Sequence, residues 1–294
     1  MSNIITTSQF TKQEILDYMN RADQLKNLDF LEFPSNKTII LMFFEPSTRT
    51  FCSFQAAANK LGCKIICLTE KYSSFEKGES LEDTIKTLNV FGDVIILRHP
   101  EKGAAQKAVL ASKVPIINAG DGAGEHPTQA LLDLYTIFKE LATFGIDLNS
   151  ENRETITITF LGDIKHSRTV HSLIPLLHFF PKIKLIQVCP PNLEIPEVEI
   201  STMENVISIT DVLYVTRIQK ERFTNKIEYD LVNLITVNKK LLEKAKKKMI
   251  IMHPLPRLTE ISTDIDSDPR AVYFKQIENG VYIRMAILEK ILSR

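Results

Sequence analysis

The chain alternates between uninterrupted apolar runs and polar clusters. Residues 39–44 are all aliphatic or aromatic, which is typical of a strand covered on both faces in a parallel sheet. Helical patterns separate most of the apolar runs, and this alternation predicts an α/β fold with parallel sheets. Further strands are predicted at residues 64–68, 94–97, 114–118, 155–161, 184–189, 212–216 and 249–253.

A long periodic stretch divides these strands into two series. Residues 127–144 carry leucine, isoleucine and phenylalanine at helical spacing, and we expect this helix to bridge two domains. The polar stretch 149–154 then opens a second series of strands and helices. The predicted fold class is α/β, with two doubly wound parallel-sheet domains joined by long helices. The expected domains are residues 1–140, with a C-terminal helix at about 280–294 packing back on them, and residues 141–279.

Hydroxyl side chains and one guanidinium follow the first apolar run. Pro46 and Ser47 signal a helix start, and the Ala-rich stretch 51–61 continues as a helix with Ser47 as its expected N-cap. Backbone N–H groups at the start of a helix attract phosphate, and Arg49 adds a forked cation. Capping explains Ser47 alone. The run therefore predicts an anion site made of Ser47, Thr48, Arg49 and Thr50.

Other strand ends in the first half deliver hydrogen-bond donors. Arg98 follows the strand at 94–97, and His126 and Gln129 follow the strand that ends near Asn118. In a parallel sheet these groups converge at one edge. Donors polarise a carbonyl and arginines hold a leaving phosphate, so the set suits transfer of a small carbonyl group from phosphate. Taken alone, His126 fits equally well as a core histidine at a helix start.

Arginines also follow strands in the second half. Arg168 opens a helix after the strand at 155–161, and Arg217 follows the strand at 212–216. Each can hold a carboxylate through two parallel hydrogen bonds, which predicts a dicarboxylic acceptor. A surface ion pair would explain either arginine singly. The loop before Arg168 lacks the Gly-x-Gly-x-x-Gly pattern, so dinucleotide binding is rejected.

Composition and charge narrow the classes of partner. The 294 residues suffice for about two domains, and 36 basic against 36 acidic side chains argue against nucleic acid or a membrane surface as the main partner. No apolar stretch approaches the ~18 residues of a membrane span, and the N-terminal residues lack the pattern of a secretion signal. We therefore expect a cytoplasmic protein. The lysine-rich run 239–248 predicts a solvated amphipathic helix.

Cysteine and histidine usage gives no sign of a metal. Cys52, Cys63, Cys67 and Cys189 form no Cys-x-x-Cys pair and neighbour no histidine at ligand spacing. We expect four reduced, buried thiols. The six histidines are scattered, and no carboxylate cluster has metal-ligand spacing. We therefore expect neither a metal nor any other cofactor.

Several motifs in one order identify a family. They are Pro-Ser-Thr-Arg-Thr at 46–50, Lys-Gly-Glu-Ser at 77–80, Leu-Arg-His-Pro at 97–100, Ala-Gly-Asp-Gly at 119–122, His-Pro-Thr-Gln at 126–129, Arg-Thr-Val-His-Ser at 168–172, Thr-Arg-Ile-Gln at 216–219 and His-Pro-Leu-Pro-Arg at 253–257. From about residue 39 onward, the chain resembles the catalytic chains of the aspartate carbamoyltransferase family. The resemblance implies carbamoyl transfer from carbamoyl phosphate to L-aspartate, a step of de novo pyrimidine biosynthesis.

The resemblance also implies a role for each motif residue. The first domain would bind carbamoyl phosphate and the second would bind aspartate. Phosphate would be bound by Ser47, Thr48, Arg49 and Thr50, and the carbamoyl oxygen by Thr50, Arg98 and His126. The carbamoyl nitrogen would meet Gln129 and the backbone carbonyls of Leu255 and Pro256. The aspartate carboxylates would be held by Ser73, Lys77, Arg168, Arg217 and Gln219. The catalytic set would be Arg49, Thr50, Lys77, Arg98 and His126.

The loop with Lys77 carries an implication for assembly. In the family this loop reaches into the neighbouring subunit's site, which implies a homotrimer with shared active sites. The residues leave open whether Ser73 or Ser74 is the loop serine. They also leave open whether regulatory chains bind.

Two alternatives stand beside this interpretation. Ornithine carbamoyltransferases share the phosphate motif and His-Pro-x-Gln, but usually carry His-Cys-Leu-Pro where this chain has His-Pro-Leu-Pro at 253–256. Lys77 and the Arg-x-Gln pattern at 217–219 favour aspartate. The other alternative is a catalytically inert anion-binding or scaffolding subunit. Against it stand the intact residues Arg49, Lys77, Arg98, His126, Arg168 and Arg217.

Overall fold

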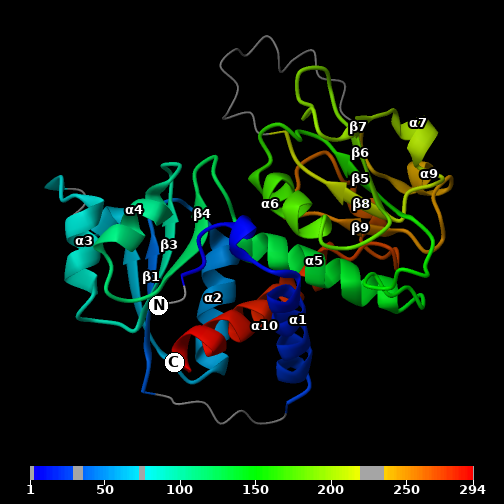
Figure 1. The fold of residues 1–294 in the computed structure, drawn as a ribbon. Helices are drawn as coiled ribbons and strands as arrows, with labels where there is room; N and C mark the ends of the chain where they lie inside the picture. Colours follow the sequence, from blue (N-terminus) through cyan, green and yellow to red (C-terminus); the bar gives the residue numbers. More distant parts are fainter. Residues whose placement is uncertain (1–2, 29–35, 73–76, 219–234, 294) are drawn as a thin grey trace. The chain divides into compact units, whose positions relative to one another are not determined.

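The computed structural model describes residues 3–28, 36–72, 77–218 and 235–293. The chain divides into two compact units (Figure 1). Unit 1 comprises Met1–Tyr135, His171–Leu176 and Ile277–Arg294, and unit 2 comprises Thr136–Val170 and Leu177–Gln276. Three helices contribute residues to both units: α5 (Pro127–Ala142), α6 (Arg168–Leu177) and α10 (Tyr273–Leu292).

Unit 1 is built on a sheet of four parallel strands in the order β2-β1-β3-β4. Figure 1 shows α3 and α4 on one side of this sheet and α2 on the other. The strands are β1 (Thr38–Phe43), β2 (Lys64–Thr69), β3 (Val94–His99) and β4 (Ile116–Asp121). The helices are η1 (Thr7–Gln9), α1 (Lys12–Lys26), α2 (Thr48–Lys60), η2 (Glu70–Tyr72), α3 (Leu81–Leu88) and α4 (Ala104–Ala111).

Strand β1 forms the centre of unit 1 because both of its faces are apolar. Successive side chains of a strand point to opposite faces of the sheet. Ile40 and Met42 belong to the buried cluster that includes side chains of α3 and α4. On the other face, Phe43 packs edge-on against Phe51 of α2, with ring centroids 5.2 Å apart. Burial of one such side chain contributes about 1.5–3 kcal/mol.

Unit 2 is built on five parallel strands in the order β7-β6-β5-β8-β9. Its short helices include α7 and α9, which Figure 1 shows close together at one side of the sheet. The strands are β5 (Ile156–Leu161), β6 (Ile183–Val188), β7 (Glu199–Ile200), β8 (Val212–Val215) and β9 (Ile250–Met252). The short helices are α7 (Met203–Val206), α9 (Lys239–Leu242) and η5 (Thr263–Ile265).

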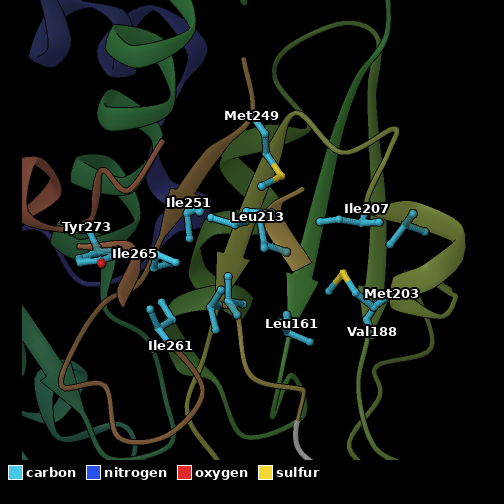
Figure 2. Packing of buried hydrophobic residues seen from close by; sticks show 14 of the residues in the cluster. Leu161, Val188, Met203, Ile207, Leu213, Met249, Ile251, Ile261, Ile265 and Tyr273 are labelled. Carbon is cyan, nitrogen blue, oxygen red and sulfur yellow. The ribbon is translucent and has the colours of Figure 1, made fainter. Parts of the chain in front are cut away.

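One apolar cluster forms the core on one face of the unit 2 sheet (Figure 2). Leu161 and Leu213 come from the neighbouring strands β5 and β8, and Ile251 comes from β9. Met203 and Ile207 from α7 and the residue after it cover these strands. Because α7 has only four residues, tertiary packing of this apolar face rather than helix propensity holds it in place.

The predicted fold class is confirmed: each unit is an α/β fold on a parallel sheet. The largest difference lies at residues 114–118, which we predicted to be the whole strand. Strand β4 instead continues to Asp121, because His99 of β3 pairs with Asp121 beyond an irregularity in the ladder. The helix predicted at 239–248 is also shorter, since α9 ends at Leu242.

The prediction of four buried thiols is wrong for two of them. Cys63 is buried and Cys189 is half-buried, but Cys52 and Cys67 are exposed. Cys67 lies on β2, the edge strand of its sheet, whose burial pattern is mostly exposed. Burial raises the pKa of Cys189 to about 11, so this thiol stays protonated at neutral pH.

Among the described residues, every helix is too short or too polar to cross a bilayer.

Gly162 follows the central strand β5 and lies against Thr216, the residue after the neighbouring strand β8. Its φ is 118°, and a Cβ atom there would lie 2.1 Å from the carbonyl oxygen of Thr216. We expect Gly162→Ala to lower the free energy of unfolding by about 2–4 kcal/mol. Gly145→Ala is the matched control, because Gly145 also has a positive φ (77°) but has open space around it. It should cost only ~1–2 kcal/mol. Urea unfolding measures both, and equal losses would contradict the close-contact argument.

Candidate active site

The N-terminus of α2 forms the first part of the candidate site. The chain leaves β1 at Phe43 and enters α2 at Thr48, with Ser47 in the N-cap position. Phe51 donates its N–H to Ser47 O (3.1 Å), so the N–H groups of residues 48–50 precede the ladder of the helix itself. The predicted capping bond is absent, because no backbone N–H donates to the Ser47 side chain. The hydroxyl and the amides therefore lie together in an arrangement that suits an anion.

Thr50 and His126 come together although they are far apart in sequence. Both side chains are buried, and Thr50 Oγ1 lies 3.4 Å from His126 Nε2. The backbone N–H of His126 donates to Ser172 Oγ (3.0 Å), a residue of α6 within unit 1. Pro127 then begins α5. The imidazole is thus fixed beside the first turn of α2, where it can contact a ligand held by that turn.

Arg98 is a buried cation of unit 1. Its Nη1 donates to Ala119 O on β4 (3.0 Å), and its Nη2 lies 3.0 Å from Glu45 Oε2. Because Glu45 follows β1, which pairs with β3, the two contacts fix the guanidinium across three neighbouring strand ends. A carboxylate partner keeps a buried guanidinium charged and oriented. Sequence reasoning missed Glu45; its place directly before the predicted anion site is the signal that could have revealed it.

A network of carboxylates holds the loop that leads to His126. Asp121 accepts the N–H groups of Gly103 through Oδ2 and Glu125 through Oδ1, both at 2.8 Å. Glu125 in turn accepts the N–H (2.6 Å) and the hydroxyl (2.8 Å) of Thr7. The N-terminal segment therefore braces the loop, and it limits the positions that His126 can adopt.

In unit 2, Arg168 and Arg217 follow two adjacent strands. Arg168 begins α6 after β5, and Arg217 follows β8, which pairs with β5 in parallel. Both side chains are half-buried. Thr216 donates its N–H to Leu161 O (2.7 Å), which ties the two strand ends together. The arrangement places two guanidinium-bearing residues at one edge of one sheet, as two carboxylates of a single ligand would require.

The loop after β9 carries Leu255 and Pro256. His253 is buried and accepts the N–H of Leu255 at Nδ1 (2.7 Å), so its Nε2 carries the proton and donates to Glu260 Oε1 (2.8 Å). Burial would raise the pKa of Glu260, but hydrogen bonds from His253 and from backbone N–H groups outweigh it and hold this pKa below its usual value. The pair fixes the backbone from which the two carbonyls project.

The remaining predicted site residues are Lys77, Ser73, Gln219 and Gln129. Lys77 is exposed on the segment before α3. Ser73 and Gln219 lie outside the described residues. Gln129 stands on the first turn of α5 and donates to Asp133 (2.8 Å). Sequence reasoning missed Asp133, although its spacing of four residues from Gln129 on a predicted helix is a readable signal.

These observations define a class of protein, an α/β fold that presents arginines and helix-terminal amides to anionic ligands at strand ends. Two family models match the chain. The carbamoyl-P binding domain of aspartate/ornithine carbamoyltransferases matches residues 2–139, and the Asp/Orn binding domain of the same enzymes matches residues 154–291. The chain belongs to the aspartate/ornithine carbamoyltransferase family.

Individual relatives agree with the family match. The aspartate carbamoyltransferase catalytic subunit of Methanocaldococcus jannaschii is 42% identical, covering 100% of this chain and 98% of its own length. Its solved structure has a TM-score of 0.87 at 41% identity, over 100% of this chain and 98% of that chain. The Trypanosoma cruzi aspartate transcarbamoylase with carbamoyl phosphate and aspartate has a TM-score of 0.89 at 39% identity, over 99% and 96%.

Some relatives are much longer. Multifunctional protein CAD of Squalus acanthias is 44% identical over 99% of this chain, and multifunctional protein pyr1-3 of Dictyostelium discoideum is 42% identical over 97%. The chain spans 13% of the length of each of these two proteins.

Proposed function

We propose that the chain acts as an aspartate carbamoyltransferase. It transfers the carbamoyl group of carbamoyl phosphate to the amino group of L-aspartate and releases N-carbamoyl-L-aspartate and phosphate, a step of de novo pyrimidine (UMP) biosynthesis. The observation that carries the proposal is the convergence of Thr50, His126 and the α2 terminus in unit 1, in a chain that matches both family domains. The solved relative named with both substrates supports the choice of aspartate.

The unit 1 residues would bind carbamoyl phosphate and polarise it. The α2 terminus with Ser47, Thr48 and Arg49 holds the phosphate. Thr50, Arg98 and His126 donate to the carbamoyl oxygen, on which negative charge develops as the amine attacks. On the nitrogen side, the acceptors are Gln129 and the carbonyls of Leu255 and Pro256.

The second substrate would be held through its two carboxylates. Arg168 and Arg217 supply forked donors, and Gln219, Lys77 and Ser73 complete the set. The unprotonated amine of aspartate attacks the carbamoyl carbon. The bond from that carbon to the phosphate oxygen then breaks, and the departing phosphate takes the proton of the amine. Catalysis on this scheme comes from positioning and electrostatics, because none of these side chains is needed as a strong base.

The proposal extends to assembly and location. Residues 1–140 with the C-terminal helix form the carbamoyl phosphate domain, and residues 141–279 form the aspartate domain; the two family descriptions support this assignment. We propose a cytoplasmic homotrimer in which the loop with Ser73 and Lys77 serves the neighbouring subunit's site. Regulatory chains are a further class of partner, which the term catalytic subunit in the name of a relative supports.

Phosphate release from carbamoyl phosphate tests the reaction. The purified chain is assayed in parallel with L-aspartate, L-ornithine and no acceptor. Release that depends on aspartate is the expected result. Release with ornithine alone would move the chain to the sister activity of the family, and no release with either amino acid would favour an inert anion-binding subunit.

Arg217→Ala should act on aspartate rather than on carbamoyl phosphate. Loss of a charged hydrogen-bond donor costs about 1.5–3 kcal/mol, so the KM for aspartate should rise about 10- to 100-fold. The KM for carbamoyl phosphate should change little. Lys184→Ala is the control, because Lys184 lies in the same unit but forms an exposed ion pair with Glu199 that is worth at most ~1 kcal/mol. An unchanged aspartate dependence in Arg217→Ala would show that the acceptor site lies elsewhere.

A further inference from the structure

The side-chain amide of Gln129 is held in one orientation by a buried carboxylate. Gln129 and Asp133 stand about one turn apart on α5, and Gln129 Nε2 lies 2.8 Å from Asp133 Oδ1. Asp133 is fully buried, whereas Gln129 is half-buried. An ionised carboxylate only accepts hydrogen bonds. The NH2 group of Gln129 must therefore face Asp133, and its oxygen Oε1 must face the other way.

The oxygen Oε1 of Gln129 faces away from Asp133 and is a hydrogen-bond acceptor. Among the described residues, none donates a hydrogen bond to Oε1 of Gln129. The backbone N–H of Gln129 donates to His126 O (3.0 Å), so both residues lie in the turn that leads into α5. His126 in turn contacts Thr50. One acceptor thus stands on the same turn as one of the donors assigned to the carbamoyl oxygen.

Arg284 of α10 is a buried cation whose charge interacts with the charge of Asp133. Arg284 is 3% exposed, and its guanidinium packs over the ring of Phe54 at 4.9 Å and donates to Ser53 Oγ (2.8 Å). Burial lowers the pKa of Arg284 to about 9, and the charge of Asp133 opposes that shift. Because a lone buried charge is costly, each group favours the ionised form of the other. An ionised Asp133 is the form that fixes the amide of Gln129.

We propose that Asp133 is a positioning residue that makes Gln129 a hydrogen-bond acceptor and so selects an acyl phosphate bearing NH2 over one bearing methyl. The inference rests on the proposed function, because it places the carbamoyl nitrogen at Gln129. Carbamoyl phosphate donates to Oε1 through its NH2 group. Acetyl phosphate has the same shape but carries a methyl group there, and it leaves the acceptor unpaired on binding, which is penalised.

The test is the ratio of two dissociation constants, for carbamoyl phosphate and acetyl phosphate, measured by calorimetry without aspartate. In Asp133→Asn, residue 133 can donate as well as accept, so the Gln129 amide can turn and present NH2 to the ligand. The preference for carbamoyl phosphate should fall about 10-fold. Gln129→Met removes the acceptor and leaves Asp133 unchanged. It should lower the preference similarly, and it provides the answer even if Asp133→Asn does not fold.

Exchanging the amide and the carboxylate between positions 129 and 133 should restore the preference for carbamoyl phosphate over acetyl phosphate. In the double variant Gln129→Glu/Asp133→Asn, the amide of residue 133 donates to the new carboxylate, whose second oxygen again accepts from the ligand, and the net charge is conserved. The preference should return to within about 3-fold of the wild-type ratio. If Asp133 only stabilised the fold, for example by neutralising Arg284, its substitution would weaken the binding of both ligands equally. The ratio of the two dissociation constants would then be unchanged in Asp133→Asn, and the double variant would have nothing to restore.

An unchanged ratio in Gln129→Met, or a ratio in Asp133→Asn that falls without recovery in the folded double variant, would overturn the proposal. The proposed function is judged separately, by aspartate-dependent phosphate release in the wild-type chain. A wild-type chain that transfers carbamoyl groups but shows no change of ratio in the variants refutes only the role of Asp133.

Discussion

Replacing Arg49 by alanine should lower kcat/KM for carbamoyl phosphate by about 10²- to 10³-fold, the range found when one preorganised donor to developing charge is removed. Arg49 lies half-buried in the first turn of α2, beside the amides of residues 48–50. A cation at the N-terminus of a helix opposes the helix dipole, at a cost of about 0.3–1 kcal/mol. Alanine removes that cost. The variant should therefore lose activity while the free energy of unfolding is maintained or slightly increased.

Two further variants serve as comparisons for Arg49→Ala. Arg49→Lys keeps the charge but loses the forked geometry, and it should be intermediate in kcat/KM. Lys60→Ala removes a positive charge from the last turn of the same helix, and it should leave kcat/KM within about 2-fold of wild type because exposed charges contribute little. Steady-state kinetics with urea unfolding measures all three. Near-normal turnover in Arg49→Ala would refute the assignment of the phosphate to the α2 terminus.

The strand pattern could be predicted because burial on both faces leaves a strong mark. The apolar run at 39–44 became β1, the buried strand at the centre of unit 1. The run at 64–68 is also mostly apolar but became the edge strand β2, with Ile66 38% exposed. An apolar run specifies a strand but not its place in the sheet. The predicted burial of Cys67 failed for that reason.

The candidate site was predictable where one short segment carries several functional groups. Ser47, Thr48, Arg49 and Thr50 are contiguous, so a strand followed by a helix suffices to bring them together. Which residues pair across distant segments was not predictable. Glu45 meets Arg98 only because β1 pairs with β3, and Arg284 meets Ser53 across 231 positions of sequence. Such pairs depend on tertiary packing, which local pattern does not encode.

Lys77 differs from the other cations of the candidate site. Arg49 and Arg98 are half-buried and buried within unit 1, whereas Lys77 is exposed on a segment that precedes α3. An exposed lysine makes no strong contribution to the fold of its own chain. If each site takes Arg49 from one subunit and Lys77 from its neighbour, then loss of either residue alone should inactivate every site of a trimer.

Mixing the two inactive variants should then restore activity. When Lys77→Ala and Arg49→Ala chains exchange subunits at equal concentration, about three quarters of the trimers are mixed and each mixed trimer has one undamaged site of three, so about one quarter of wild-type activity should return. The control mixture is Arg49→Ala with Arg98→Ala. Both residues belong to the same chain's share of the site, so every hybrid site remains damaged and no activity should return. Equal behaviour of the two mixtures, after exchange is verified by labelled subunits, would show that each chain builds its site alone.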